Sequence, residues 1–240
     1  MAWKARIITL FPEMFPGPLQ YSLAGKGLSD GVWSLETTQI RDFATDKRRT
    51  VDDTSYGHQA GMILKPDVIH KALLSARESS PQLPILNMSP RGQPLTQRMA
   101  HTLAEGPGVI LLCSRYEGID ERVLELWREE RGMVEVSVGD YILSGGEPAA
   151  LVVLDACIRL LPSIVHSTES LELESFEMDL LEFPQYTKPY DWEGRVVPEI
   201  LLSGDHKKIA AWQKDQAEKM TQMRRPDLWR AYLAKKDNAY

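Results

Sequence analysis

The chain has 240 residues, 43% of them hydrophobic and 26% charged, which is an ordinary globular composition. No apolar run reaches the roughly 18 residues that a membrane span needs, so we expect no membrane partner. The apolar stretch at the start is stopped by Pro12, which indicates a first strand rather than a signal peptide. Cys113 and Cys157 lie in apolar surroundings, which favours buried thiols in a reducing cytoplasm over a disulfide framework. The five histidines show no spacing typical of zinc.

The net charge of −6 is unevenly distributed along the chain. Residues 204–240 carry nine Lys and Arg against five Asp and Glu, whereas the rest carries 19 basic and 29 acidic residues. A basic end of this kind indicates contact with nucleic acid. The competing interpretation is a solvated helical tail of mixed charge, and composition alone favours that tail.

Strands and helices alternate along the first 165 residues. The patterns predict strands at 6–11, 31–40, 84–89, 108–113 and 133–137, and helices at 66–77, 94–106, 119–130 and 148–161. A polar segment with helix character follows the first strand, and residues 41–66 predict a long irregular loop, which is usually functional or disordered. Because the central strands are continuous apolar runs, the sequence predicts an α/β fold with a mainly parallel sheet covered by helices.

Three strand ends carry the residues that could hold a ligand. They are "NMSPRGQ" from Asn87, "CSRYEGIDE" from Cys113 and "VGDYILSGGE" from Val138. We expect them to converge, because ligands of such sheets bind beyond the carboxyl ends of the strands. Gly145 and Gly146 open a helix as in a phosphate loop, but no Lys or Arg occurs from Gly139 to Ala156. This pattern favours a neutral or cationic ligand held by backbone groups, and a plain tight helix entry is the alternative.

The character of the chain changes after residue 165. Nine acidic and two basic residues lie between His166 and Glu199, which indicates an interdomain linker at 166–185 that becomes a docked loop. A helical region at 186–240 follows, with two helices separated at Arg225–Pro226.

Several of these motifs together resemble one family. "VSVGDYILSGGE", "LLCSRYEGIDERV", "LNMSPRGQPLTQ" and "DKRRTVDDTSYGHQAGM" are similar to motifs of the bacterial tRNA (guanine-N1)-methyltransferases, which are knotted SPOUT-type enzymes. The resemblance continues through "LLEFPQYTKP" and "VPEILLSGDH" and covers nearly the whole chain in order. It implies a trefoil-knotted catalytic domain at 1–165 that binds S-adenosylmethionine, the linker at 166–185, and a small all-helical tRNA-binding domain at 186–240. It also implies a cytoplasmic homodimer with shared active sites.

The resemblance assigns the glycine loop to the adenosine part of S-adenosylmethionine, held largely by backbone contacts. It implies no metal ligand, although it leaves room for Mg²⁺ in the reaction. The implied donor-binding positions are Ser114, Val138, Gly139, Asp140, Tyr141, Ile142 and Leu143, bordered by Ser89, Pro90, Tyr116, Glu117, Gly118, Gly145 and Gly146.

The chain departs from the family pattern at two places. Ser114 stands where the family commonly has glycine, which adds a hydroxyl group, although a serine with a suitable φ can still make a backbone contact. His58 and Gln59 replace glycines, so that loop is either stiffer or offers side chains to RNA. A surface histidine without a role is an equal alternative for His58.

Methylation at N1 of guanine requires removal of the N1 proton. A carboxylate can act as the general base, and an arginine can stabilise the charge that grows on O6. The base must also be unpaired or flipped, since N1 lies on its pairing edge. The resemblance implies Glu174 as the base, where the family has an aspartate, and Arg159 as the arginine. Without the family resemblance, Arg159 is equally a helix cap or the partner of Asp155. The carboxylates that rival Glu174 as the base are Glu169, Glu172, Glu177 and Asp179.

The leading functional hypothesis is methyl transfer from S-adenosylmethionine to N1 of the guanosine at position 37 of tRNA, next to the anticodon. Arg48, Arg49, Arg224 and Arg225 are candidate phosphate contacts to the anticodon stem. The alternatives are a knotted methyltransferase that acts on ribosomal RNA and a non-catalytic RNA-binding protein of the same fold. The presence of both Glu174 and Arg159 beside an intact donor loop favours an enzyme.

Overall fold

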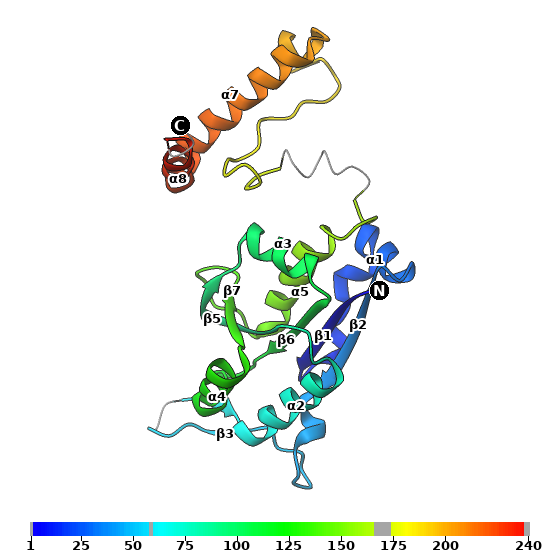
Figure 1. The fold of residues 1–240 in the computed structure, drawn as a ribbon, viewed down its shortest axis with the longest axis vertical. Coiled ribbons are helices and arrows are strands. Elements are labelled where there is room, and N and C mark those ends of the chain that lie inside the picture. Colours follow the sequence, from blue (N-terminus) through cyan, green and yellow to red (C-terminus); the bar gives the residue numbers. More distant parts are fainter. Residues whose placement is uncertain (1, 58–59, 166–173, 238–240) are drawn as a thin grey trace. The chain divides into compact units, whose positions relative to one another are not determined.

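A computed structural model describes residues 2–57, 60–165 and 174–237 of the chain (Figure 1). The chain forms two compact units, Met1–His166 and Ser167–Tyr240. Among the described helices, none is long and apolar enough to cross a membrane.

A five-stranded parallel sheet forms the centre of the first unit. Its strand order is β2-β1-β6-β5-β7, and every pairing between neighbours is parallel. All six residues of the middle strand are buried, as expected for a strand that is covered on both faces. The strands are β1 Trp3–Thr9, β2 Trp33–Gln39, β5 Ile85–Pro94, β6 Gly108–Cys113 and β7 Val134–Ser137. The expected mainly parallel α/β sheet is therefore confirmed, whereas the trefoil knot stays a prediction.

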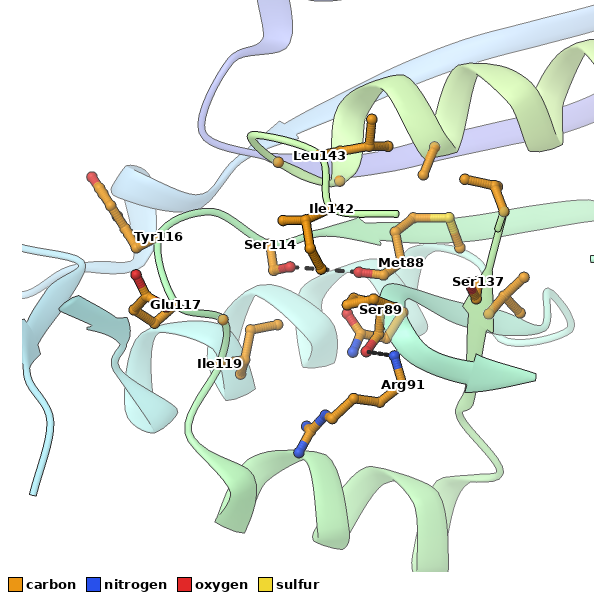
Figure 2. Close-up of a pocket in the computed structure, with 18 of the residues that line it drawn as sticks. Met88, Ser89, Arg91, Ser114, Tyr116, Glu117, Ile119, Ser137, Ile142 and Leu143 are labelled. Carbon is orange, nitrogen blue, oxygen red and sulfur yellow. Dashed lines mark hydrogen bonds between the residues drawn. The ribbon is translucent and has the colours of Figure 1, made fainter. Parts of the chain in front are cut away.

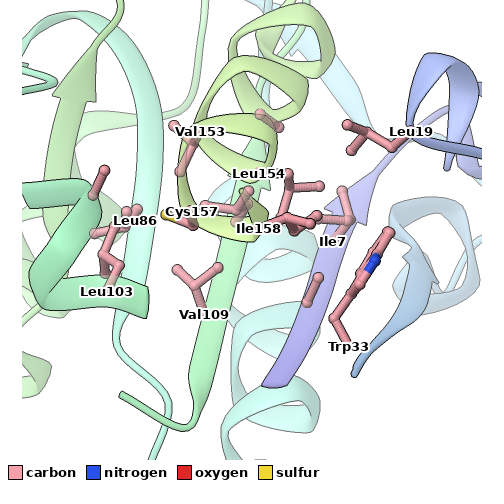
Figure 3. Packing of buried hydrophobic residues seen from close by; sticks show 14 of the residues in the cluster. Ile7, Leu19, Trp33, Leu86, Leu103, Val109, Val153, Leu154, Cys157 and Ile158 are labelled. Atoms are coloured by element: carbon pink, nitrogen blue, oxygen red, sulfur yellow. The ribbon is translucent and has the colours of Figure 1, made fainter. Parts of the chain in front are cut away.

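Helices cover both faces of this sheet (Figure 1). Helices α1 (Ser22–Ser29), α3 (Gln97–Glu105) and α5 (Gly146–Ile158) pack on one face, and α2 (Pro66–Ser79) and α4 (Glu121–Arg131) pack on the other. Successive side chains of a strand point to opposite faces, so Ile7 and Ile8 of β1 enter different cores. Figure 3 shows α5 packed on the first face, where Leu154 and Ile158 lie beside Ile7.

Two helices of the first unit begin after a residue whose side chain caps them. Thr96 accepts a hydrogen bond from the backbone N–H of Met99 and begins α3, and Asp120 accepts one from the backbone N–H of Arg122 and begins α4. Helix α4 ends at Gly132, whose φ of 67° is the left-handed conformation that favours glycine.

Two parts of the first unit differ from the sequence prediction. Helix α5 begins at Gly146 instead of Pro148, so Glu147, expected in the loop, lies in the first helical turn. The segment 41–66, expected to be irregular, contains the antiparallel strands β3 (Asp52–Thr54) and β4 (Met62–Leu64). Strands of three residues are too short to show a periodic pattern. Short 3-10 helices occupy Pro12–Met14, Gly17–Gln20 and Ile40–Phe43.

The second unit is helical as expected and also contains a hairpin. Helices α7 (His206–Arg224) and α8 (Pro226–Asp237) are separated at Arg225–Pro226, as predicted, and a 3-10 helix occupies Glu199–Leu202. The hairpin joins β8 (Asp191–Trp192) to β9 (Arg195–Val196) through two residues of positive φ, Glu193 and Gly194. The backbone N–H of Leu181 donates to Thr221 Oγ1 at 2.8 Å, so the end of the predicted linker is docked on α7.

Candidate active site

Residues 87–91 within β5 and the loops that follow β6 and β7 line one cavity of about 480 Å³ (Figure 2). They come together because the carboxyl ends of parallel strands lie at the same edge of a sheet. The first turn of α5 closes one side, where Gly145, Gly146 and Ala149 line the cavity. A cavity of this size accommodates a ligand as large as a nucleoside.

Thirteen of the fourteen predicted donor-binding residues line this cavity. The exception is Asp140, which is exposed and is not among the lining residues. The thirteen are Ser89, Pro90, Ser114, Tyr116, Glu117, Gly118, Val138, Gly139, Tyr141, Ile142, Leu143, Gly145 and Gly146. The lining also includes residues that were not among the predicted donor-binding positions. They are Ile63, Asn87, Met88, Arg91, Ile119, Glu121, Leu124, Val136, Ser137 and Ala149. Of these, Asn87, Met88, Arg91, Ile119 and Glu121 lie in the strand-end motifs that the sequence indicated.

The glycine pair lets the start of α5 approach the end of β6. The N–H of Gly146 donates to the carbonyl of Ser114 at 2.8 Å, and a Cβ atom on Gly146 would lie 2.8 Å from Cα of Cys113. A Cβ atom on Gly145 would lie 2.3 Å from Nε of Arg115. A Cβ at Gly146 would meet backbone atoms that cannot yield, whereas one at Gly145 would force the Arg115 side chain to move. The pair therefore has the structural role of a tight helix entry and also forms a wall of the cavity.

A buried ion pair holds the glycine loop in place. Glu147 is completely buried, and its carboxylate accepts hydrogen bonds from Thr9 Oγ1 at 2.7 Å and from Arg115 Nε at 2.8 Å. Arg115 also donates to the carbonyl of Ser144 at 3.3 Å and lies 4.5 Å from the ring centroid of Phe11. The network joins the ends of β1 and β6 to the start of α5. Although Arg115 brings a cation near the loop, that charge is neutralised by Glu147.

The loop after β6 is braced by β4, the short strand that the sequence did not predict. The N–H of Glu117 donates to the carbonyl of Met62 at 3.0 Å, and the N–H of Leu64 donates to the carbonyl of Gly118 at 2.9 Å. Tyr116 has a φ of 60°, which is uncommon for a residue other than glycine and occurs in loops that surrounding contacts fix. The segment before α2, which contains the family-like motif "DKRRTVDDTSYGHQAGM", therefore shapes the cavity.

A network of charged residues lies where β5 and α4 approach each other. Glu121 accepts hydrogen bonds from Arg128 at 2.6 Å and from Arg91 at 2.9 Å, and Arg128 also bonds Glu135 at 3.0 Å. Burial by itself would raise the pKa of Glu121, but the bonds from Arg128 and Arg91 outweigh it and lower that pKa. Figure 2 shows Arg91 extending towards α4. Asn87 joins the network through its amide nitrogen, which donates to Glu135 at 3.0 Å.

The two predicted catalytic residues lie in different units. Arg159 caps the end of α5 and is partly buried, and its backbone N–H donates to the carbonyl of Asp155 at 3.2 Å. Its side chain lines a second, mainly apolar cavity of about 850 Å³ together with Tyr21 and Val152. Glu174 belongs to the second unit, where its carbonyl accepts from the N–H of Glu177 at 3.3 Å in a turn.

The remaining candidates are the loop residues 58 and 59, the rival carboxylates and the arginines expected to contact phosphates. His58, Gln59, Glu169 and Glu172 lie outside them. Asp179 is paired with Lys235 at 2.5 Å, Arg49 with Asp42 at 3.3 Å, and Arg225 with Asp227 at 2.6 Å, whereas Arg48 and Arg224 are exposed. Within the described ranges, no group of three or more His, Cys, Asp or Glu is arranged to hold a metal ion.

The family model and three relatives described here share a name for one activity. A family model described as tRNA (Guanine-1)-methyltransferase TrmD matches residues 3–231. A protein of Novosphingobium aromaticivorans named tRNA (guanine-N(1)-)-methyltransferase is 56% identical over 233 residues, which cover 97% of this chain and 93% of that protein. Proteins of the same name from Mesorhizobium japonicum and Rhodospirillum rubrum are 57% and 53% identical. Each alignment covers 98% of this chain, with 100% and 95% of the respective relative.

Proposed function

The chain belongs to the tRNA (guanine-1)-methyltransferase family, and on that premise we propose that it transfers a methyl group from S-adenosylmethionine to N1 of guanosine 37 in tRNA. The observation that carries this proposal is the cavity at the carboxyl edge of the sheet, lined by thirteen of the positions that the family resemblance implies for the donor. An RNA-binding protein without catalysis has no need of such a cavity.

The cavity fits the adenosine part of the donor. Its glycine loop contains no basic residue, and Arg115 is already paired with Glu147, so the loop suits an uncharged nucleoside better than a phosphate. The glycines of the loop carry no side chain, so they allow a ligand to approach its backbone closely. When bound, the donor supplies an electrophilic methyl group on a sulfonium.

We assign the proton step to Glu174 and the charge on O6 to Arg159. The Glu174 carboxylate takes the proton from N1 of guanine, and the nitrogen lone pair then forms the new bond to the methyl carbon. The carbon–sulfur bond breaks with its electrons on sulfur, which leaves S-adenosylhomocysteine. The Arg159 guanidinium stabilises the negative charge on O6 while the proton leaves.

We further propose a homodimer in which each site combines residues of two copies. The cavity belongs to the first unit and Glu174 to the second, and the family resemblance implies that Glu174 comes from the partner subunit. The second, mainly apolar cavity beside Arg159 supports a protein contact there. Its lining includes Tyr21, Leu23 and Val152, which are 68%, 42% and 48% exposed. A second copy of the chain would cover these apolar side chains.

The substrate part of the proposal rests on charge and on the relatives. Exposed Arg48 and Arg224 are suited to phosphate contacts, and the basic balance of residues 204–240 favours an RNA partner for the second unit. We place the protein in the cytoplasm with its tRNA substrate. Ribosomal RNA and a purely binding role are less favoured, because the family and the similar proteins are named for a tRNA methyltransferase.

The test is methyl transfer from labelled S-adenosylmethionine to an unmodified tRNA transcript that has guanosine at position 37, followed by mass mapping of the product. The matched substrate has adenosine at position 37, and a ribosomal RNA fragment is the third arm. The proposal predicts N1-methylguanosine with the first substrate alone. Label in ribosomal RNA, or no transfer at all, contradicts it, and a chelator added to the same assay tests the Mg²⁺ requirement.

Single-turnover rates at saturating donor test the assignment of the base. Glu174→Gln should bind donor and tRNA but lose about 10²–10⁴-fold in rate, the usual effect of removing a general base. Glu177→Gln and Asp179→Asn are the matched controls in the same acidic run. Parental rates in Glu174→Gln together with a loss in either control would place the base elsewhere. A mixture of the Glu174→Ala and Gly145→Val proteins should recover activity. In a heterodimer of the two, both substitutions can fall in one site, which leaves the other site intact.

A further inference from the structure

Asn87 is a polar residue inside an otherwise apolar stretch of β5. It is 2% exposed and lies between Leu86 and Met88, which are also buried. Throughout the residues that the structure describes, its Oδ1 is the one buried side-chain nitrogen or oxygen atom without a hydrogen-bond partner. A buried acceptor without a donor is unfavourable, so native proteins rarely leave one unless water or a ligand supplies the donor.

The orientation of the Asn87 amide is fixed by its neighbour on β7. The amide nitrogen donates to Glu135 Oε1 at 3.0 Å, and Glu135 Oε2 is held by Arg128 at 3.0 Å. If the amide were reversed, its oxygen would face a carboxylate, and two acceptors would oppose each other. The free position of Asn87 is therefore its oxygen, and a matching ligand group must be a hydrogen-bond donor.

Asn87 lines the same cavity as the donor loops. The lining also includes Ile119 and Leu124, whose side chains have no donor to offer. The carboxylates of Glu121 and Glu135 are paired with arginines, so this part of the cavity holds no unpaired negative charge for a cation. A neutral N–H or O–H group of the ligand fits better than an ammonium group.

We propose that Asn87 is a specificity-determining residue whose Oδ1 accepts a hydrogen bond from the nucleoside part of the methyl donor. The exocyclic amine of adenine and the ribose hydroxyls share this chemistry, and the ligand series below distinguishes them. The inference rests on the proposed function, because it takes the cavity to be the donor site. It extends that function by naming a side chain that selects the nucleoside, whereas the loops offer mainly backbone groups.

The experiment measures the affinity of the purified full-length protein for S-adenosylhomocysteine by calorimetry. Three analogues each lack one donor: the 6-deamino purine, the 2′-deoxy and the 3′-deoxy compounds. The parent protein should bind one of them about tenfold more weakly than S-adenosylhomocysteine, because the buried acceptor then stays unpaired. The analogue that shows the loss identifies the group that Asn87 contacts.

The variant Asn87→Leu completes a double-mutant cycle with the same ligands. It should bind S-adenosylhomocysteine about tenfold more weakly and should no longer discriminate against the analogue that the parent rejects. Asn87→Ser, which is smaller and fits the same volume, replaces it if the leucine variant does not fold. Glu125→Gln, an exposed change on α4, is the control that should leave every affinity unchanged.

The possible results separate the two proposals. If the parent binds neither S-adenosylmethionine nor S-adenosylhomocysteine, the proposed function fails. If the parent binds S-adenosylhomocysteine and all three analogues equally, the role of Asn87 is wrong while the donor site stands. If the Asn87 variant loses affinity for all the ligands uniformly and still discriminates among the analogues as the parent does, Asn87 is only a structural residue. A crystal structure of the complex with S-adenosylhomocysteine in which only a water molecule contacts Asn87 Oδ1 would also overturn the proposed role of Asn87.

Discussion

Glu147 offers the most direct test of how the donor loop is held. Its carboxylate is completely buried and connects Thr9 to Arg115, which in turn contacts Ser144. Removing one partner of a buried ion pair costs about 3–5 kcal/mol, because the other charge is left without compensation. Arg115 retains 20% exposure and its contact with Phe11, so Glu147→Ala should fall near the lower limit, about 3 kcal/mol.

This loss should be visible by scanning calorimetry. For a unit of this size each kcal/mol shifts the melting temperature by roughly 2–4 °C, so Glu147→Ala should melt roughly 6–12 °C below the parent. Glu147→Gln should lose less, because its amide oxygen can still accept from Arg115 Nε while its amide nitrogen can donate to Thr9 Oγ1. Asp42→Asn removes one partner of the exposed pair with Arg49 in the same unit and should shift the transition very little.

The same variants should separate stability from donor binding. In Glu147→Ala the start of α5 loses its anchor, so S-adenosylhomocysteine should bind more weakly even at temperatures where the protein remains folded. If Glu147→Ala melts within about 2 °C of Asp42→Asn and binds the ligand normally, the buried network does not hold the loop, and the reasoning is refuted.

Other parts of the structure give further expected outcomes. Gly139→Val should abolish S-adenosylhomocysteine binding in calorimetry while the circular dichroism spectrum of the protein stays unchanged. Gly139 has a φ of 150°, and an added Cβ would lie 2.4 Å from the ring of Tyr141. Normal affinity in the folded variant would contradict the assignment of the loop to the donor. Burial raises the pKa of the Cys113 thiol and raises that of Cys157 to about 12, so a thiol reagent at pH 8 should label neither in the native protein and both after unfolding. Burial, followed by the hydrogen bond to Glu218, raises the pKa of Tyr232 to about 12, so its contribution to stability should be complete below about pH 10 and lost as the pH rises through 12. Tyrosinate absorbance compared with Tyr232→Phe measures this, and a difference that already appears near pH 10 would show the shift to be absent.

The sheet and the convergence of the loops could be predicted from local patterns. The buried strand from Gly108 to Cys113 is a continuous apolar run, and the rule for parallel sheets then brings the loop chemistry to one edge. Glu147 could not be placed in this way, because an acidic residue near a helix start normally indicates exposure. Its partner Arg115 lies 32 residues earlier, at a distance that no local pattern covers.

Other features could not be predicted from local sequence patterns, because they depend on long-range contacts or were implied by the family resemblance alone. The pairing of Met62 and Leu64 with the loop after β6 joins residues more than 50 positions apart, and short strands carry no periodic signal. Asn87 did leave a trace in the sequence, as the one polar residue within "PILNM", but its missing partner is a property of the fold. The role of Glu174 came from the resemblance alone, since its neighbours are equally acidic.

The position of β1 in the sheet affects the order in which the protein can fold during synthesis. One neighbour of β1 is β2, but the other is β6, and Trp3 Nε1 donates to the carbonyl of Leu103, 100 residues later. At a ribosome speed of about 5–20 residues per second, an interior strand waits roughly 5–20 s for its second partner. During that interval Ile7 and Ile8 have no complete core to enter, so the nascent chain exposes an apolar strand edge that a chaperone would have to shield.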